Sequence, residues 1–226
     1  MTTALEVVTK DCTALTDGEL AEMADLSAGS LAPWEVGFLS KQREDWVLVT
    51  HAREEGKLRG YALSTLERIG GTPSLLIGPA AFTRSRTAGA ALESVMHDLY
   101  RRAVLAFPDE DVLVGTRFAR SSGYAAFSGL EDIVPRPDHK ASGEERAWGR
   151  RLAKRFRVES QLDDRTAVIR GDGDLTGLLD FDPAKAPKAA SIYDVCFEQV
   201  DSERHDTVVA FGWAMAEGLA EGSLPR

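Results

Sequence analysis

The chain has 226 residues, of which 43% are hydrophobic and 28% charged, and its formal net charge is −9. This composition is typical of a globular protein, and the negative charge argues against general adhesion to nucleic acids or anionic membranes. No stretch approaches the ~18 apolar residues that a membrane-spanning helix needs, and the first residues lack the pattern of a secretory signal. We therefore expect a cytoplasmic protein with no membrane partner.

The two cysteines, Cys12 and Cys196, lie near opposite ends of the chain and belong to no paired motif. Structural zinc sites and disulfide frameworks need closely spaced or multiple cysteines. We expect neither a disulfide nor a metal.

The N-terminal segment predicts a strand followed by two helices. Residues 5–8 alternate between apolar and polar side chains, as a short strand does. Thr16 and Glu19 have the spacing of a capping box, which opens a helix. Pro33 favours the start of a second helix, which we expect to run to about Arg43.

Three strands are expected next, separated by short polar turns that make antiparallel neighbours. Gly78 and Pro79 are expected to end or kink the third of them, because proline lacks the amide hydrogen that a sheet needs. The expected strands cover residues 46–49, 59–64 and 75–77.

The pattern then changes to helical spacing. Residues 88–103 keep one face apolar over about five turns, and a buried strand at 112–114 and a helix at about 121–130 follow. This order predicts an α/β protein of the α+β type, with a mixed, mostly antiparallel sheet flanked by helices. We interpret residues 1–226 as a single domain, in which 136–226 supply a basic helix and a C-terminal extension.

The turn before the long helix is the candidate binding site. A helix N-terminus offers free backbone donors and a partial positive charge, and small residues let an anion approach them. Two arginines add forked, charge-assisted hydrogen bonds. An ordinary helix capped by Thr87 is the alternative interpretation. The segment consists of Arg84, Ser85, Arg86, Thr87, Ala88, Gly89, Ala90 and Ala91.

Arg86, Gly89 and Ala91 fit the pattern Arg-x-x-Gly-x-Ala. With this order of elements, residues 1–135 resemble the GCN5-related N-acetyltransferase (GNAT) superfamily. The resemblance implies that the turn Arg84–Ala91 binds the pyrophosphate of coenzyme A, in an acyl-donor-binding core over residues 1–135. Acetyl-coenzyme A or another acyl-coenzyme A would then be the co-substrate.

Acyl transfer to an amine also needs groups that move protons. The superfamily often places a tyrosine that acts as the general acid on the helix after the fifth strand, and Tyr124 lies at this point of the chain. The alternative role for Tyr124 is that of a packed aromatic side chain. Glu67 is a candidate base by its position on a strand, since the strand at 75–77 carries no carboxylate.

A basic helix at 144–157 stands out in an otherwise acidic chain. Its cations either form a solvated face or bind an anion such as a phosphate of the donor or the backbone of a tRNA. The residues predicted to share one stripe are Arg146, Arg150, Lys154 and Arg157.

The sequence thus predicts an N-acyltransferase that moves an acyl group from an acyl-coenzyme A to the amine of a small molecule or peptide. Two alternatives remain: an aminoacyltransferase that uses aminoacyl-tRNA as donor, and an inactive member that only binds a ligand. The expected partners are the amine acceptor, a tRNA on the first alternative, and a second copy of the chain in a homodimer.

Overall fold

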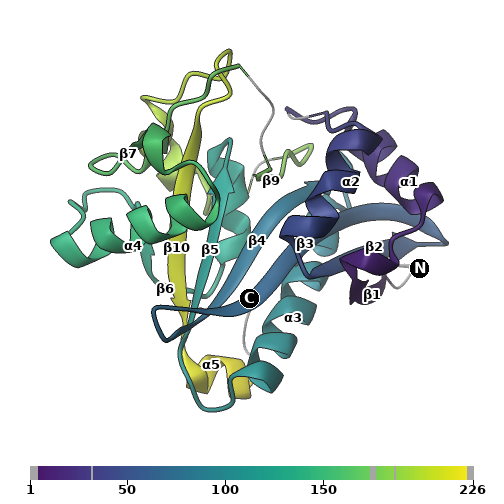
Figure 1. The fold of residues 1–226 in the computed structure, drawn as a ribbon, viewed down its shortest axis with the longest axis horizontal. Helices are drawn as coiled ribbons and strands as arrows, with labels where there is room; N and C mark the ends of the chain where they lie inside the picture. Colours follow the sequence, from purple (N-terminus) through teal and green to yellow (C-terminus); the bar gives the residue numbers. More distant parts are fainter. Residues whose placement is uncertain (1–4, 32, 174–176, 186, 223–226) are drawn as a thin grey trace.

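The computed structural model describes residues 5–31, 33–173, 177–185 and 187–222. Ten strands of these residues form one mixed sheet, in the order β1-β2-β3-β4-β9-β5-β10-β8-β7, with β6 paired to β10. Most neighbouring strands are antiparallel, whereas β4, β9 and β5 run parallel to one another. The expected class, a mostly antiparallel mixed sheet flanked by helices, is confirmed (Figure 1).

The strands are β1 (Glu6–Asp11), β2 (Leu48–Glu54), β3 (Lys57–Ile69), β4 (Thr72–Phe82), β5 (Val112–Phe118), β6 (Glu131–Val134), β7 (Leu162–Asp163), β8 (Val168–Ile169), β9 (Leu179–Asp180) and β10 (Thr207–Ala214). The α-helices are α1 (Asp17–Ser27), α2 (Val36–Asp45), α3 (Ala88–Ala106), α4 (Gly143–Arg155) and α5 (Ala216–Ala220). The 3₁₀-helices are η1 (Cys12–Ala14), η2 (Ser121–Phe127), η3 (Glu159–Gln161) and η4 (Ser191–Phe197). None of the helices in the described part of the chain is long and apolar enough to cross a bilayer.

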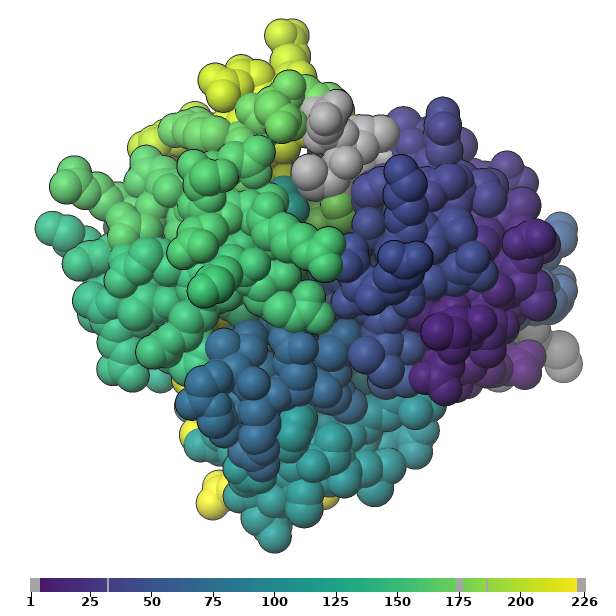
Figure 2. Space-filling view, viewed as in Figure 1, coloured from purple at the N-terminus to yellow at the C-terminus, as the bar shows by residue number. Residues whose placement is uncertain are grey.

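Two apolar clusters, one on each face of the sheet, hold the helices in place. One cluster joins the sheet to α3, α5, η2 and η4, and the other joins it to α1, α2 and α4. Figure 2 views the second face, on which α1 and α2 (purple to blue) and the α4 region (green) cover opposite sides. The long α3 buries one stripe, from Ala88 to Ala103, because its apolar residues recur at helical spacing.

The capping box of α1 is present as predicted, with Thr16 accepting from the amide of Glu19 and Glu19 accepting from that of Thr16. Of the two effects expected of Gly78 and Pro79, an end of the third strand is wrong, because β4 continues to Phe82, whereas a local irregularity is present. The register with β3 shifts between Ala62 and Ser64, so this part of β4 forms a bulge. A bulge leaves a residue outside the ladder, which is where a sheet tolerates proline.

Two further segments differ from the prediction. The helix expected at about 121–130 is the shorter 3₁₀-helix η2. The basic helix α4 ends at Arg155, and Arg157 lies beyond it with a left-handed backbone, at φ 60°. Arg157 therefore does not continue the helical stripe of cations.

The C-terminal extension returns to the centre of the sheet. Beyond β6, the chain forms α4, crosses the sheet, and supplies β9 between β4 and β5 and β10 beside β5. β4 and β5 pair directly only between Ser74–Leu76 and Leu113–Gly115. Further along, both strands pair with Leu179 of β9 instead, at Ala80 and Phe118. The extension therefore fills the opening where β4 and β5 diverge.

Candidate functional site

The candidate site lies at the edge of the sheet where three parallel strands end. Because β4, β9 and β5 run in the same direction, their carboxyl ends meet at one edge, the usual place for ligand sites in such sheets. Two residues beyond the end of each strand stands a charged side chain: Arg84 after β4, Asp182 after β9 and Arg120 after β5. Both α3 and η2 begin at this edge as well.

The turn that leads into α3 is anchored to the neighbouring strand. The amide of Thr83 donates to the carbonyl oxygen of Arg59 at 2.8 Å, and its hydroxyl donates to the same oxygen at 3.1 Å. The hydroxyls of Ser85 and Thr87 bond to each other at 3.0 Å, so Thr87 does not cap the helix. Thr87 occupies the N-cap position of α3, as the alternative interpretation expects, but its side chain makes no capping hydrogen bond.

The uncapped N-terminus of α3 leaves backbone donors available. Within the described part of the chain, no acceptor bonds to the amides of Gly89 and Ala90, and both residues are exposed. A side chain added at Gly89 would meet nothing within 4 Å, so there is open space next to its backbone. Arg84 and Arg86 are exposed beside this N-terminus. Free amides, the helix dipole and two guanidinium groups together favour an anion here.

Acidic residues of the extension lie against Arg84 and Arg120. One carboxylate oxygen of Asp182, Oδ2, lies 3.5 Å from Nη1 of Arg84 and 3.1 Å from Nη1 of Arg120. Asp180 is 2% exposed and accepts a hydrogen bond from the amide of Leu31 at 2.8 Å. Burial raises the pKa of Asp180, although Arg120 opposes that effect.

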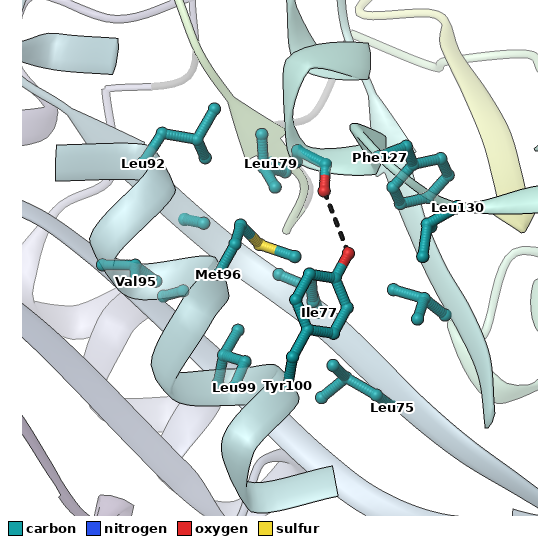
Figure 3. Packing of buried hydrophobic residues seen from close by; sticks show 14 of the residues in the cluster. Leu75, Ile77, Leu92, Val95, Met96, Leu99, Tyr100, Phe127, Leu130 and Leu179 are labelled. Carbon is teal, nitrogen blue, oxygen red and sulfur yellow. Dashed lines mark hydrogen bonds between the residues drawn. The ribbon is translucent and has the colours of Figure 1, made fainter. Parts of the chain in front are cut away.

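A cavity of about 560 Å³ opens beside the N-terminus of α3. Its size lies in the range of small-molecule sites, and its lining is mainly apolar, with few polar groups. Figure 3 shows Leu92 and Met96 of α3 pointing toward Phe127 and Leu179. The walls are Gly89, Leu92, Glu93 and Met96 of α3, residues of the η2–β6 segment (Tyr124, Ala125, Phe127–Leu130 and Ile133), and Phe181, Pro187, Ala189, Ala190, Ile192 and Tyr193 of the extension.

Tyr124 lies in the wall of this cavity but is 4% exposed. Its ring stacks on that of Tyr193, with 3.9 Å between the ring centroids, and its hydroxyl donates to the carbonyl oxygen of Pro135 at 3.2 Å. Burial raises the pKa of the Tyr124 phenol well above its usual value. A phenol is protonated at neutral pH even without this shift, and the raised pKa makes Tyr124 a weaker acid.

Glu67 lies at the other end of the sheet. It pairs with Ser74 at the start of β4, whereas the candidate site follows the end of that strand. At about 3.3 Å per residue, Ser74 and the end of β4 at Phe82 are roughly 25 Å apart. Oε1 of Glu67 accepts a hydrogen bond from Nε of Arg155 at 2.7 Å. The structure therefore does not bring Glu67 and Tyr124 together, and Glu67 is not a base for this site.

The cations of the basic helix have mostly internal partners. Arg146 donates to the carbonyl oxygen of Ala141 at 2.9 Å, Arg150 to Asp164 at 2.5 Å, and Arg157 pairs with Asp45 at 2.7 Å. Lys154 is exposed and, with Arg151, Arg155 and Arg157, lines a shallow hollow next to α2. This hollow lies on the α1–α2–α4 face, away from the cavity beside α3.

Three residues near the site were not identified from the sequence: Arg120, Asp182 and Tyr193. Each lies in a loop or 3₁₀-helix, and the last two belong to an extension whose path across the sheet no local pattern predicts. The only sequence signal was the position of Arg120, which follows a buried strand as Arg84 does.

No protein-family model matches the chain, and no curated protein does. Solved structures that resemble it include the aminoglycoside N-acetyltransferase AAC(6')-Iy in complex with CoA, at 14% identity and a TM-score of 0.38, covering 50% of this chain and 78% of that one. A second is a ribosomal-protein-alanine N-acetyltransferase from Brucella melitensis biovar Abortus 2308, at 17% identity and a TM-score of 0.38, covering 49% of this chain and 79% of that one. A third is an acyl-CoA N-acyltransferase from Pseudomonas aeruginosa, at 18% identity and a TM-score of 0.37, covering 50% of this chain and 79% of that one. At TM-scores below 0.5 these similarities carry no functional argument, which has to come from the chain's own residues.

Proposed function

We propose that this protein is an N-acyltransferase that moves an acyl group from acetyl-coenzyme A or another acyl-coenzyme A to the amine of a small molecule or peptide. The observation that carries the proposal is the uncapped N-terminus of α3, with the free amides of Gly89 and Ala90, beside Arg84 and Arg86 and next to a largely apolar cavity. A ligand with an anionic group and a long, mainly apolar arm fits this site, since the anion can bind at the N-terminus of α3 and the arm can enter the cavity.

The parts of an acyl-coenzyme A match the two halves of the site. The pyrophosphate would accept hydrogen bonds from the amides of Gly89 and Ala90 and from the guanidinium groups of Arg84 and Arg86. The pantetheine arm, which is uncharged, would extend into the cavity along Leu92 and Met96. The order of elements from β1 to β6 agrees with the resemblance seen in the sequence, which implies the same assignment of the turn.

The reaction joins the amine nitrogen to the thioester carbonyl carbon and breaks the carbon–sulfur bond. The amine loses a proton, and the departing thiolate takes one up. Tyr124 is our candidate for the donor of that proton, because it lines the cavity and remains protonated. Its hydroxyl must leave the carbonyl of Pro135 to do so, and Tyr193, whose ring is the more exposed of the stacked pair, is the competing candidate.

Turnover of single phenylalanine variants tests the proposal and the choice between the two tyrosines. We expect the protein to release thiol from acetyl-coenzyme A in the presence of a suitable amine, and Tyr124→Phe to lower kcat about 100-fold, the low end for loss of a general acid. Tyr193→Phe is the matched control and should change kcat by less than threefold. Loss of activity in Tyr193→Phe alone would move the role to Tyr193.

The same assay addresses the inactive alternative. Tight binding of coenzyme A without thiol release, across amines of small molecules and peptides, would contradict the acyltransferase and favour a ligand-binding protein. Transfer from aminoacyl-tRNA, with no transfer from acyl-coenzyme A, would favour the aminoacyltransferase instead.

A further inference from the structure

We propose that Arg120 is a third arginine of the donor's phosphate site, and that Asp182 occupies this site as an internal competitor that the donor displaces. The inference rests on the proposed function, because it names residues of the same site. It adds an arginine that follows β5 and a carboxylate of the extension to a site that the sequence confined to the turn Arg84–Ala91.

The register of the three parallel strands brings their ends together. β4 ends at Phe82, β9 at Asp180 and β5 at Phe118, and these ends lie side by side. Arg84, Asp182 and Arg120 each stand two residues further on, so the carboxylate lies between the two guanidinium groups. The site therefore has arginines from the segments that follow the two flanking strands and an acid from the segment that follows the strand between them.

One carboxylate oxygen of Asp182 is shared by two arginines. Oδ2 of Asp182 is within 3.5 Å of Arg84 and within 3.1 Å of Arg120, so a single carboxylate oxygen serves both guanidinium groups. The pyrophosphate of coenzyme A offers four non-bridging oxygens and two negative charges, and could serve both arginines and the free amides of α3 together. Asp182 is thus the weaker of two anions for the same cations.

The hydrogen bonding of Arg120 is incomplete. Its Nε lies 3.4 Å from Oδ1 of Asp180, yet both atoms are buried and neither makes a hydrogen bond in the described part of the chain. Buried polar groups in native proteins are normally paired, and an exception calls for an explanation. The buried Nε therefore holds the side chain against Asp180, while the Arg120 side chain as a whole is 28% exposed and turns Nη1 toward Asp182, where a phosphate could take the place of that carboxylate.

The fold restricts which part of the extension must move. Leu179 and Phe181 are at most 1% exposed and belong to the cluster beneath α3, so β9 itself is part of the core. The side chain of Asp182 is 29% exposed, and the residue lies beyond the strand. Displacement therefore requires only that this side chain rotates away, not that the strand leaves the sheet.

The test is the affinity of Asp182→Asn for two probes, coenzyme A and inorganic pyrophosphate, measured by isothermal titration calorimetry. Removing the competing charge should tighten the binding of both probes about three- to tenfold, as expected for loss of partly exposed ion pairs. Asp182→Glu restores the charge and should return the affinity to within twofold of the wild-type value. Asp109→Asn makes the same chemical change at the opposite end of α3 and should leave both affinities unchanged.

Each outcome separates this inference from the proposed function. If coenzyme A binds to Asp182→Asn as tightly as to the wild type, or more weakly, the inference is overturned. The proposed function is unaffected by either result. Tighter pyrophosphate binding by Asp182→Asn, without coenzyme A binding by either protein, would support the anion site and contradict the function. If neither coenzyme A nor pyrophosphate binds to either folded protein, both the inference and the proposed function are overturned.

Discussion

Phe181→Ala should lower the free energy of unfolding by about 3–5 kcal/mol, the usual cost of removing a large buried aromatic side chain. Phe181 is fully buried, and its ring packs edge-on against that of Phe82, with 5.8 Å between the ring centroids. The residue follows β9, so this loss would establish that the extension is part of the core of the sheet. Chemical denaturation followed by circular dichroism measures the effect.

Val195→Ala is the control for this experiment, because it also removes apolar atoms from the extension. Val195 lies in η4 and is 50% exposed, so its loss should change the free energy of unfolding by no more than about 0.5 kcal/mol. If Phe181→Ala cost less than 1 kcal/mol, β9 would not be an integral strand. The argument that only the side chain of Asp182 moves would then fail.

Charge reversal of both arginines in the turn should weaken coenzyme A binding by at least 100-fold. Each hydrogen bond between a guanidinium group and a phosphate contributes about 1.5–3 kcal/mol, and a glutamate in its place repels the ligand. Arg84 and Arg86 are exposed, so Arg84→Glu with Arg86→Glu should leave the fold intact. Calorimetry with coenzyme A measures the loss.

A matched double variant separates this local effect from the change in net charge. Lys140→Glu with Arg165→Glu alters the charge by the same amount at two exposed residues of another part of the surface. Its affinity for coenzyme A should stay within about twofold of the wild-type value at moderate salt, because distant charges are screened. Equal losses in the two double variants would mean that the turn has no specific role.

Much of the fold could be predicted because its signals are local. The capping box at Thr16 and Glu19 satisfies free amides of a helix, so four residues are enough to identify the start of α1. The long α3 was equally clear from its apolar spacing. Pro79 misled the prediction because a bulge, which depends on the neighbouring strand, accommodates it within β4.

One part of the candidate site could also be predicted from local sequence, and another part depends on contacts between distant segments. The turn before α3 is a local feature, and its small residues and arginines could be recognised directly. The partnership of Asp182 with Arg84 and Arg120 depends on the pairing of β9 with β4 and β5, roughly 60 to 100 residues away in sequence, which no local rule predicts. Glu67, in contrast, was predicted as a site residue and lies far from the site. A position on a strand does not by itself reveal which end of the sheet a residue occupies.

A crystal structure of the protein with coenzyme A tests the central claim most directly. We expect the pyrophosphate within hydrogen-bond distance of the amides of Gly89 and Ala90 and of the guanidinium group of Arg84. The pantetheine arm should lie in the cavity along Leu92 and Met96. Coenzyme A bound elsewhere, with the N-terminus of α3 still facing solvent, would contradict the account.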